Sequence, residues 1–129
     1  MPVALSDTAR RLLDHPTYVT LSTVNPDGTP QASVVWAKRD GDDVLISTTT
    51  ARQKARNLRK DPHVSVTFFD PNEPFVYAEI RGEASVSDEG GRELIDELSV
   101  KYTGERYPSE PEGTVRVVIR VTPDRVLGR

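Results

Sequence analysis

A short segment in the first half of the chain combines hydroxyl groups, cations and a helix start in a pattern that can bind an anion. Thr50 and Gln53 have the spacing of a capping box, so the sequence predicts a helix that begins near Ala51. Arg52 and Lys54 then fall in its first turns, where the helix dipole already places about half a positive charge. A bound phosphate or carboxylate resolves this conflict, because threonine hydroxyls, unpaired backbone N–H groups and two cations together form an anion site.

The same two cations also fit a second interpretation. Arg56, Arg59 and Lys60 follow them in the predicted helix, so Arg52 and Lys54 can equally belong to a basic face that is exposed to water. The segment by itself leaves these two interpretations open.

Other catalytic and metal-binding patterns are weak. The chain has no cysteine, which excludes disulfides, thiolate catalysis and cysteine-ligated metals. Each of its two histidines, His15 and His63, lies next to a proline, and we expect surface or packing roles for both. There is no nucleophile elbow, P-loop or Rossmann glycine pattern. The sequence therefore identifies no catalytic residue and no metal site, and an anion site beside apolar strands suggests a phosphorylated cofactor that carries the reactivity itself.

Length and composition limit the possible classes of protein. A chain of 129 residues fits a single domain spanning residues 1–129. Only 36% of the residues are apolar and 29% are charged, so we expect a partner subunit to cover part of the apolar surface. The net charge of -3 argues against general nucleic-acid binding. Without a long apolar run or a signal-peptide pattern, we expect a cytoplasmic protein that does not bind membranes.

Periodicity predicts a mainly β protein with short helices at the connections. The first half should contain a short helix behind a Ser6 cap that ends before His15-Pro16, a hairpin of residues 18–24 and 31–38, and a strand at 44–46. The second half should contain strands at 64–68 and 75–87, a helix over 94–102, a surface loop, and a strand at 115–121 that Pro123 ends. Gly82 inside the long strand indicates a bulge or a close backbone approach. Six mostly antiparallel strands of this kind predict a small β-barrel.

Five stretches occur in a characteristic order at residues 28–36, 45–48, 52–62, 77–82 and 126–128. Together they resemble the pyridoxamine-phosphate-oxidase-like flavin and deazaflavin oxidoreductases, in particular the B branch that uses the deazaflavin coenzyme F420. The resemblance covers nearly the whole chain. It implies a six-stranded split β-barrel of the FMN-binding type that forms a homodimer, with two cofactor sites at the subunit interface.

The resemblance also implies which residues bind the cofactor. The family's phosphate-binding pattern falls on Ser47, Thr48, Thr49, Arg52 and Lys54, which agrees with the anion site inferred from the helix. The remaining implied residues are Gln31, Val35 and Trp36 on the strand that lines the ring system, Gln53, and Phe75 with Tyr77 on an aromatic strand near the same pocket. Trp36 fits a core or dimer-interface position equally well. Gln53 stands where FMN-binding relatives have arginine, which favours the deazaflavin.

The function implied by the resemblance is a reductase in which reduced F420 delivers a hydride to an unsaturated small molecule. The protein would chiefly position the reactants, with the proton coming from water or from Tyr77. Two alternatives remain open: an FMN-dependent oxidoreductase of the same fold, and a cofactor-binding protein without turnover.

Overall fold

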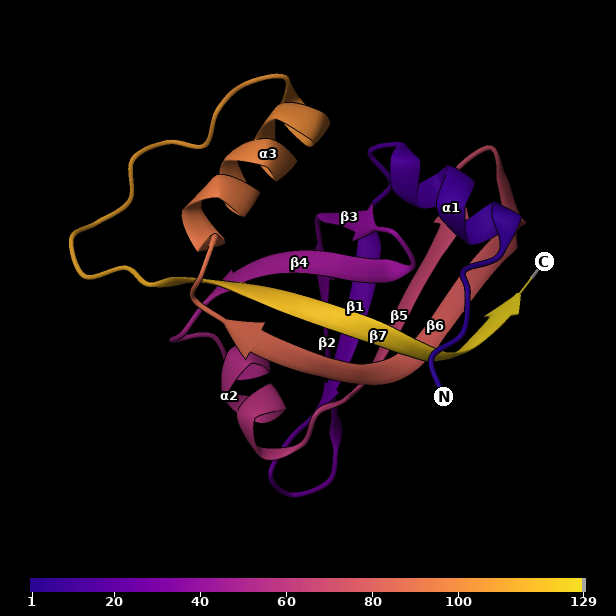
Figure 1. Ribbon diagram of the computed structural model, residues 1–129, viewed down its shortest axis with the longest axis horizontal. Coiled ribbons are helices and arrows are strands. Elements are labelled where there is room, and N and C mark those ends of the chain that lie inside the picture. Colours follow the sequence, from indigo (N-terminus) through magenta and orange to yellow (C-terminus); the bar gives the residue numbers. More distant parts are fainter. Residues whose placement is uncertain (129) are drawn as a thin grey trace.

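The computed structural model describes residues 1–128, which form seven strands and three helices (Figure 1). In chain order the elements are α1 (Asp7–Asp14), β1 (Val19–Val24), β2 (Pro30–Val35), β3 (Ala37–Asp40), β4 (Asp43–Thr49), α2 (Gln53–Lys60), β5 (His63–Asp70), β6 (Glu73–Ser87), α3 (Gly91–Thr103) and β7 (Arg116–Gly128). The strands make one antiparallel sheet in the order β2-β1-β5-β6-β7-β4-β3. The prediction of a mainly β fold is confirmed, with one strand more than expected.

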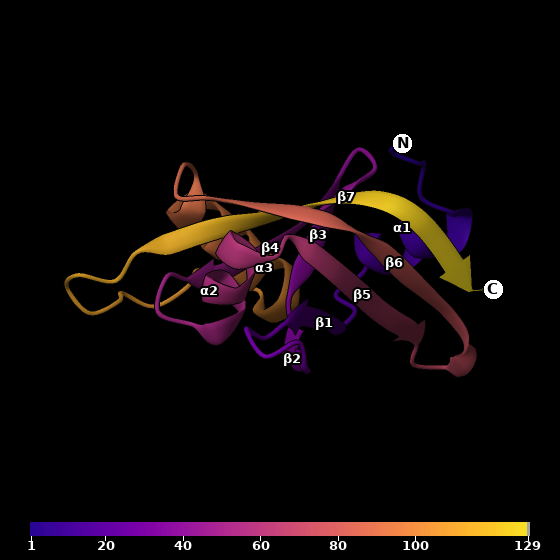
Figure 2. The same cartoon turned by 90° about the horizontal axis from the view of Figure 1, so that it is seen from below.

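The extra strand arises at Trp36 and explains the curvature of the sheet. The predicted strand over 31–38 is wrong as a single element, because β2 pairs with β1 whereas β3 pairs with β4. β2 and β3 lie at opposite edges of the sheet, yet Trp36 alone separates them in sequence. One residue can connect the two edges only if the sheet curls until they meet, and Figure 2 shows this curled sheet from below.

The long strand β6 carries the predicted bulge. The register between β6 and β7 shifts between Arg81 and Gly82, and a Cβ at Gly82 would lie 2.0 Å from the carbonyl oxygen of Thr122. The expectation of a close backbone approach is therefore confirmed. The expectation that Pro123 ends the last strand is wrong: β7 continues to Gly128, because Pro123 lies opposite Gly82 at the bulge, where the ladder is already interrupted.

The core fills the inside of the curled sheet, and α1 closes one end of it. Leu21, Ile80 and Ile119 are fully buried on the inner face. The predicted cap of α1 is confirmed, since the backbone N–H of Ala9 donates to Ser6 Oγ at 3.2 Å. None of the helices in residues 1–128 has the length and apolar character that crossing a membrane would require.

Candidate cofactor-binding site

A cavity of about 280 Å³ lies where β2 ends, β4 ends and α2 begins. α3 and the segment after it form the opposite wall. The lining residues are Tyr18, Val34, Val35, Trp36, Ser47, Thr48, Thr49, Arg52, Lys54, Ile95, Leu98, Tyr107 and Arg116. The cavity thus brings together Val35, Trp36, the three hydroxyl residues 47–49, Arg52 and Lys54, all of which the sequence singled out for cofactor binding.

The start of α2 differs from the prediction. The helix begins at Gln53, with Arg52 as its N-cap residue and no side chain capping its first turn. The prediction of a capping box is wrong, because the Gln53 side chain points along the helix. Its Nε2 donates to Asn57 Oδ1 at 2.7 Å, and its Oε1 accepts from Arg56 Nη2 at 2.6 Å. The first turn therefore presents backbone N–H groups that no side chain of residues 1–128 caps, as an anion site requires.

Lys54 is a partly buried cation in the lining of the cavity. Its ammonium is half-buried and donates to Ser33 Oγ at 2.8 Å, which is a neutral partner. Burial lowers the pKa of Lys54, and the neighbouring Arg52 charge lowers it further. A half-buried cation without a carboxylate partner is an electrostatic cost that a bound anion would remove.

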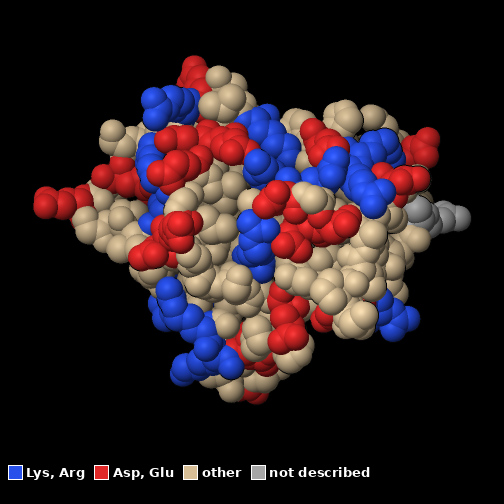
Figure 3. Space-filling view, viewed as in Figure 1, with Lys and Arg blue, Asp and Glu red and all other residues tan. Residues whose placement is uncertain are grey.

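The charges around the cavity are of one sign. Arg52, Lys54 and Arg116 all line it, and within residues 1–128 no acidic side chain does. The outer face of α2 carries Arg56, Arg59 and Lys60, which are exposed and contribute to the basic patch over this helix in Figure 3. The two interpretations of the basic segment therefore apply to different residues: Lys54 faces the cavity, and the later cations form a solvated face.

A buried asparagine holds α2 against the hairpin of β1 and β2. Asn57 is only 1% exposed, and its Nδ2 donates to Thr23 Oγ1 at 3.0 Å and to Asn25 Oδ1 at 2.9 Å. With the bond from Gln53, both polar atoms of the amide have protein partners. The network fixes the start of α2 relative to the cavity. Nothing in the sequence indicated this network beyond the presence of an asparagine next to Leu58.

Trp36 forms one wall of the cavity and is held by α3. Its indole stacks on the Tyr102 ring, with centroids 5.3 Å apart and planes at 14°, and meets the Tyr107 ring edge-on at 6.4 Å. The Tyr102 hydroxyl accepts from the backbone N–H of Ala37 at 3.1 Å, and Lys101 Nζ donates to the carbonyl of Ala37 at 2.7 Å. α3 thus binds both backbone polar groups of Ala37. This helix therefore fixes the point between β2 and β3 at which Trp36 lies.

Four predicted residues lie away from the cavity within this chain. Gln31 accepts a bond from Thr23 on the hairpin, and Gln53 is occupied by the contacts described above. Phe75 and Tyr77 lie on the first half of β6 and are 81% and 39% exposed. Their part in cofactor binding stays a prediction.

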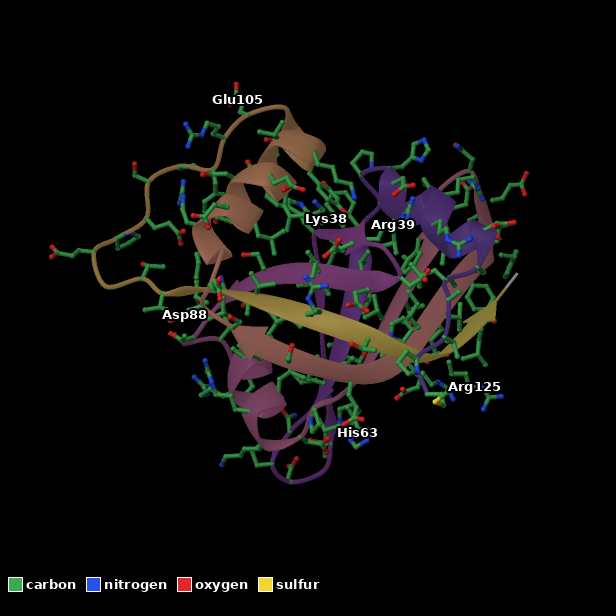
Figure 4. The ribbon with its side chains drawn as sticks, viewed as in Figure 1. Lys38, Arg39, His63, Asp88, Glu105 and Arg125 are labelled. Carbon is green, nitrogen blue, oxygen red and sulfur yellow. The ribbon has the colours of Figure 1, made fainter. Side chains whose placement is uncertain are left out.

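Six lining residues were not predicted from the sequence: Tyr18, Val34, Ile95, Leu98, Tyr107 and Arg116. Ile95 and Leu98 had a helical spacing that indicated only burial, and Tyr107 fell in the expected surface loop. Arg116 fell in the strand predicted at residues 115–121, where the pattern gave no indication of a site. His63 is exposed at the start of β5 (Figure 4), where it pairs with Asp61 at 2.7 Å, and His15 is exposed after α1.

Comparison with known proteins assigns the fold and the family. The family model of pyridoxamine 5'-phosphate oxidase matches residues 5–129. The chain belongs to this family. It is similar to a solved structure named F420 reductase, with 33% sequence identity and a TM-score of 0.82 over 93% of this chain and 96% of that one. Together with the curled antiparallel sheet, this match confirms the split-barrel class.

Two further solved structures share the fold of this chain at lower sequence identity. A conserved hypothetical protein from Mycobacterium tuberculosis is 24% identical, with a TM-score of 0.76 over 97% of this chain and 84% of that one. A pyridoxamine 5'-phosphate oxidase-related, FMN binding protein from Nostoc punctiforme is 19% identical, with a TM-score of 0.68 over 91% and 76%. Family membership supports an oxidoreductase or cofactor-binding role with a flavin-type cofactor.

Proposed function

We propose that the chain is a homodimeric, F420-dependent reductase that transfers a hydride from reduced F420 to an unsaturated small molecule. The observation that carries this proposal is the cavity itself, where Arg52, Lys54 and the uncapped start of α2 meet beside Trp36 without an acidic lining residue in the described chain. Such a cavity fits a phosphorylated ligand that also has a planar ring. The 33% identity to a protein named F420 reductase supports the deazaflavin as that ligand.

Different residues of the cavity would bind different parts of the ligand. Ser47, Thr48 and Thr49 supply hydroxyl groups and Lys54 supplies charge toward a phosphate, while Trp36 offers an aromatic face to a ring. When bound, the deazaflavin supplies the hydride. The protein would bind and orient the reactants, as the absence of an acid–base pair in the sequence suggested.

The proton that accompanies the hydride needs a separate source. Tyr77 does not line the cavity of its own chain, whereas Tyr18 and Tyr107 do. We therefore propose that one of these hydroxyl groups, or water, supplies the proton.

Space for a larger ligand lies next to the cavity. Tyr18 and Val34 also line a neighbouring groove of about 640 Å³ that continues toward Phe69. A cavity of about 280 Å³ is small for a complete cofactor, since small-molecule sites usually measure about 300–1,000 Å³. The groove offers the additional volume that the rest of a cofactor and a substrate need.

The proposed dimer is supported by the apolar side chains that this chain leaves in water. Val34, Phe69 and Phe75 are 66%, 52% and 81% exposed. A second copy of the chain would bury such residues and could bring Phe75 and Tyr77 to the partner's cavity. Light scattering should detect a dimer at micromolar concentration, and a folded monomer at that concentration would contradict this part of the proposal.

FMN is the alternative cofactor, because the same cavity suits any phosphorylated flavin. Spectral titration of the apo-protein with F420 and with FMN separates the two. We expect tighter binding of F420, followed by oxidation of reduced F420 when an unsaturated acceptor is added. Preferential binding of FMN would select the alternative. Tight F420 binding without oxidation across a broad panel of acceptors would select a cofactor-binding protein without turnover.

A further inference from the structure

Arg116 brings a cation to the cavity from the far end of the sequence. As the first residue of β7 it pairs with Thr49, the last residue of β4. Its carbonyl oxygen lies against Gly91 at the start of α3, where a Cβ would come within 2.3 Å of that oxygen. A strand and a helix terminus therefore hold the backbone of Arg116 in place, so its side chain leaves the sheet at a well-defined position.

The guanidinium of Arg116 has an inner and an outer side. On the outer side Nε donates to both carboxylate oxygens of Glu110 at 3.0 Å. On the inner side Nη1 donates to Ser47 Oγ at 3.3 Å, and Nη2 donates to Tyr107 Oη at 3.2 Å. An arginine has five N–H donors, so these bonds leave one donor on each Nη without a partner in residues 1–128. The side chain is only 15% exposed, which makes free donors costly.

Glu110 does not neutralise this cation fully. Its Oε1 also accepts from Arg92 Nη1 at 3.0 Å, so two guanidinium groups share its single charge. The wider cluster contains Arg92, Arg106 and Arg116 against Asp96 and Glu110, which leaves one net positive charge. Glu110 does not line the cavity but lines a second hollow, and Arg116 lies between the two because it lines both. Glu110 therefore binds Arg116 through Nε, whereas the partners of its two Nη groups, Ser47 and Tyr107, line the cavity.

We propose that Arg116 is a third cationic residue of the anion site and donates from its two Nη groups to a phosphate of the ligand. Glu110 and Tyr107 act as positioning residues from the segment after α3. The inference rests on the cavity assigned under the proposed function. It adds the requirement that β7 also supplies a cation to the ligand, which the α2 residues alone do not impose. A site that holds Arg52, Lys54 and Arg116 together is better matched by a ligand with a phosphate than by a neutral ligand.

The test compares Arg116→Gln with Arg120→Gln on two ligands that differ only in a phosphate, FMN and riboflavin. Arg120 is a matched control, because it lies on the same strand, is paired with Asp40 and Asp43, and does not line the cavity. Quenching of Trp36, which is the only tryptophan, reports binding in the cavity directly. We expect Arg116→Gln to weaken FMN binding about tenfold or more and riboflavin binding less than twofold, and Arg120→Gln to change neither by more than about twofold.

The outcomes separate this inference from the proposed function. Equal weakening of FMN and riboflavin by Arg116→Gln, or equal effects of the two substitutions, would overturn the inference. If Lys54→Ala weakens FMN binding while Arg116→Gln does not, the anion site stands without Arg116. If the wild-type protein binds neither FMN nor F420, the proposed function fails first. Should Arg116→Gln not fold, Arg116→Lys keeps the charge but loses the guanidinium fork, and we expect about a threefold to tenfold loss on FMN alone.

Discussion

Lys54→Ala should weaken cofactor binding far more than Lys60→Ala, although both substitutions remove one positive charge from the same helix. Lys54 is half-buried at the cavity, and its Nζ contacts only Ser33 Oγ at 2.8 Å among the described residues. Lys60 is exposed in the last turn of α2, where a cation is already favourable to the helix dipole. The two positions thus differ in what a bound phosphate could gain from them.

The expected magnitudes follow from these positions. A hydrogen bond to a charged group is worth about 1.5–3 kcal/mol, so loss of the Lys54 ammonium should raise the dissociation constant roughly tenfold to a hundredfold. Six residues of helix separate Lys60 from Lys54, which corresponds to about 9 Å. Screening at physiological salt acts over about 8 Å, so Lys60→Ala should change the dissociation constant by less than about twofold.

Isothermal titration with F420 and with FMN measures both variants, after light scattering and thermal unfolding have shown that each keeps its fold and assembly. The comparison is informative because both substitutions change the net charge equally. Equal losses would mean that α2 contributes only a diffuse basic field. No loss from Lys54→Ala would place the phosphate elsewhere and refute the assignment of this cavity.

Three further predictions concern stability, pH and the electron donor. Asn57→Ala should lower the free energy of unfolding by about 1–3 kcal/mol in urea titrations, because it strips partners from buried polar groups, whereas exposed Arg59→Ala should stay within about 0.5 kcal/mol. Burial lowers the pKa of Lys101 from 10.5 to about 8, so the unfolded chain binds more protons between these values and the Lys101 contribution to stability should rise with pH across that range. Lys101→Met should remove this rise in unfolding experiments at pH 7.5 to 10, and an unchanged pH profile would contradict the assignment. Stopped-flow measurements should show oxidation of reduced F420 in preference to reduced nicotinamides, since the chain has an anion site but no dinucleotide fingerprint, and faster turnover with a nicotinamide alone would contradict it.

Features that depend on neighbouring residues were predictable. The cap of α1 at Ser6, the alternation that makes β5 and β7 strands, and the bulge at Gly82 are all read from local spacing. The hydroxyl groups of residues 47–49, Arg52 and Lys54 also lie close together in sequence, so one turn of chain is enough to bring them to the same cavity.

Local signals failed where another partner competed for the same group. Gln53 was expected to cap the helix through Thr50, but the buried Asn57 and the Arg56 guanidinium bind its side chain instead. Pro123 was expected to stop a strand, but the bulge at Gly82 removes the need for its missing N–H. Contacts within α2 overrode the first signal, and pairing between distant strands overrode the second.

The sequence by itself therefore determined the class of fold and the place of residues 47–49, Arg52 and Lys54 in the candidate site, because helix starts, strand alternation and the order of motifs are encoded over short distances. Only the tertiary structure decided that Tyr107 and Arg116 belong to the same cavity, since this depends on β7 pairing with β4 across more than sixty residues. It also decided the position of Trp36, whose place between the two edges of the sheet follows from the strand order. Strand order is set by the burial of the whole sheet, and no local pattern of residues records it.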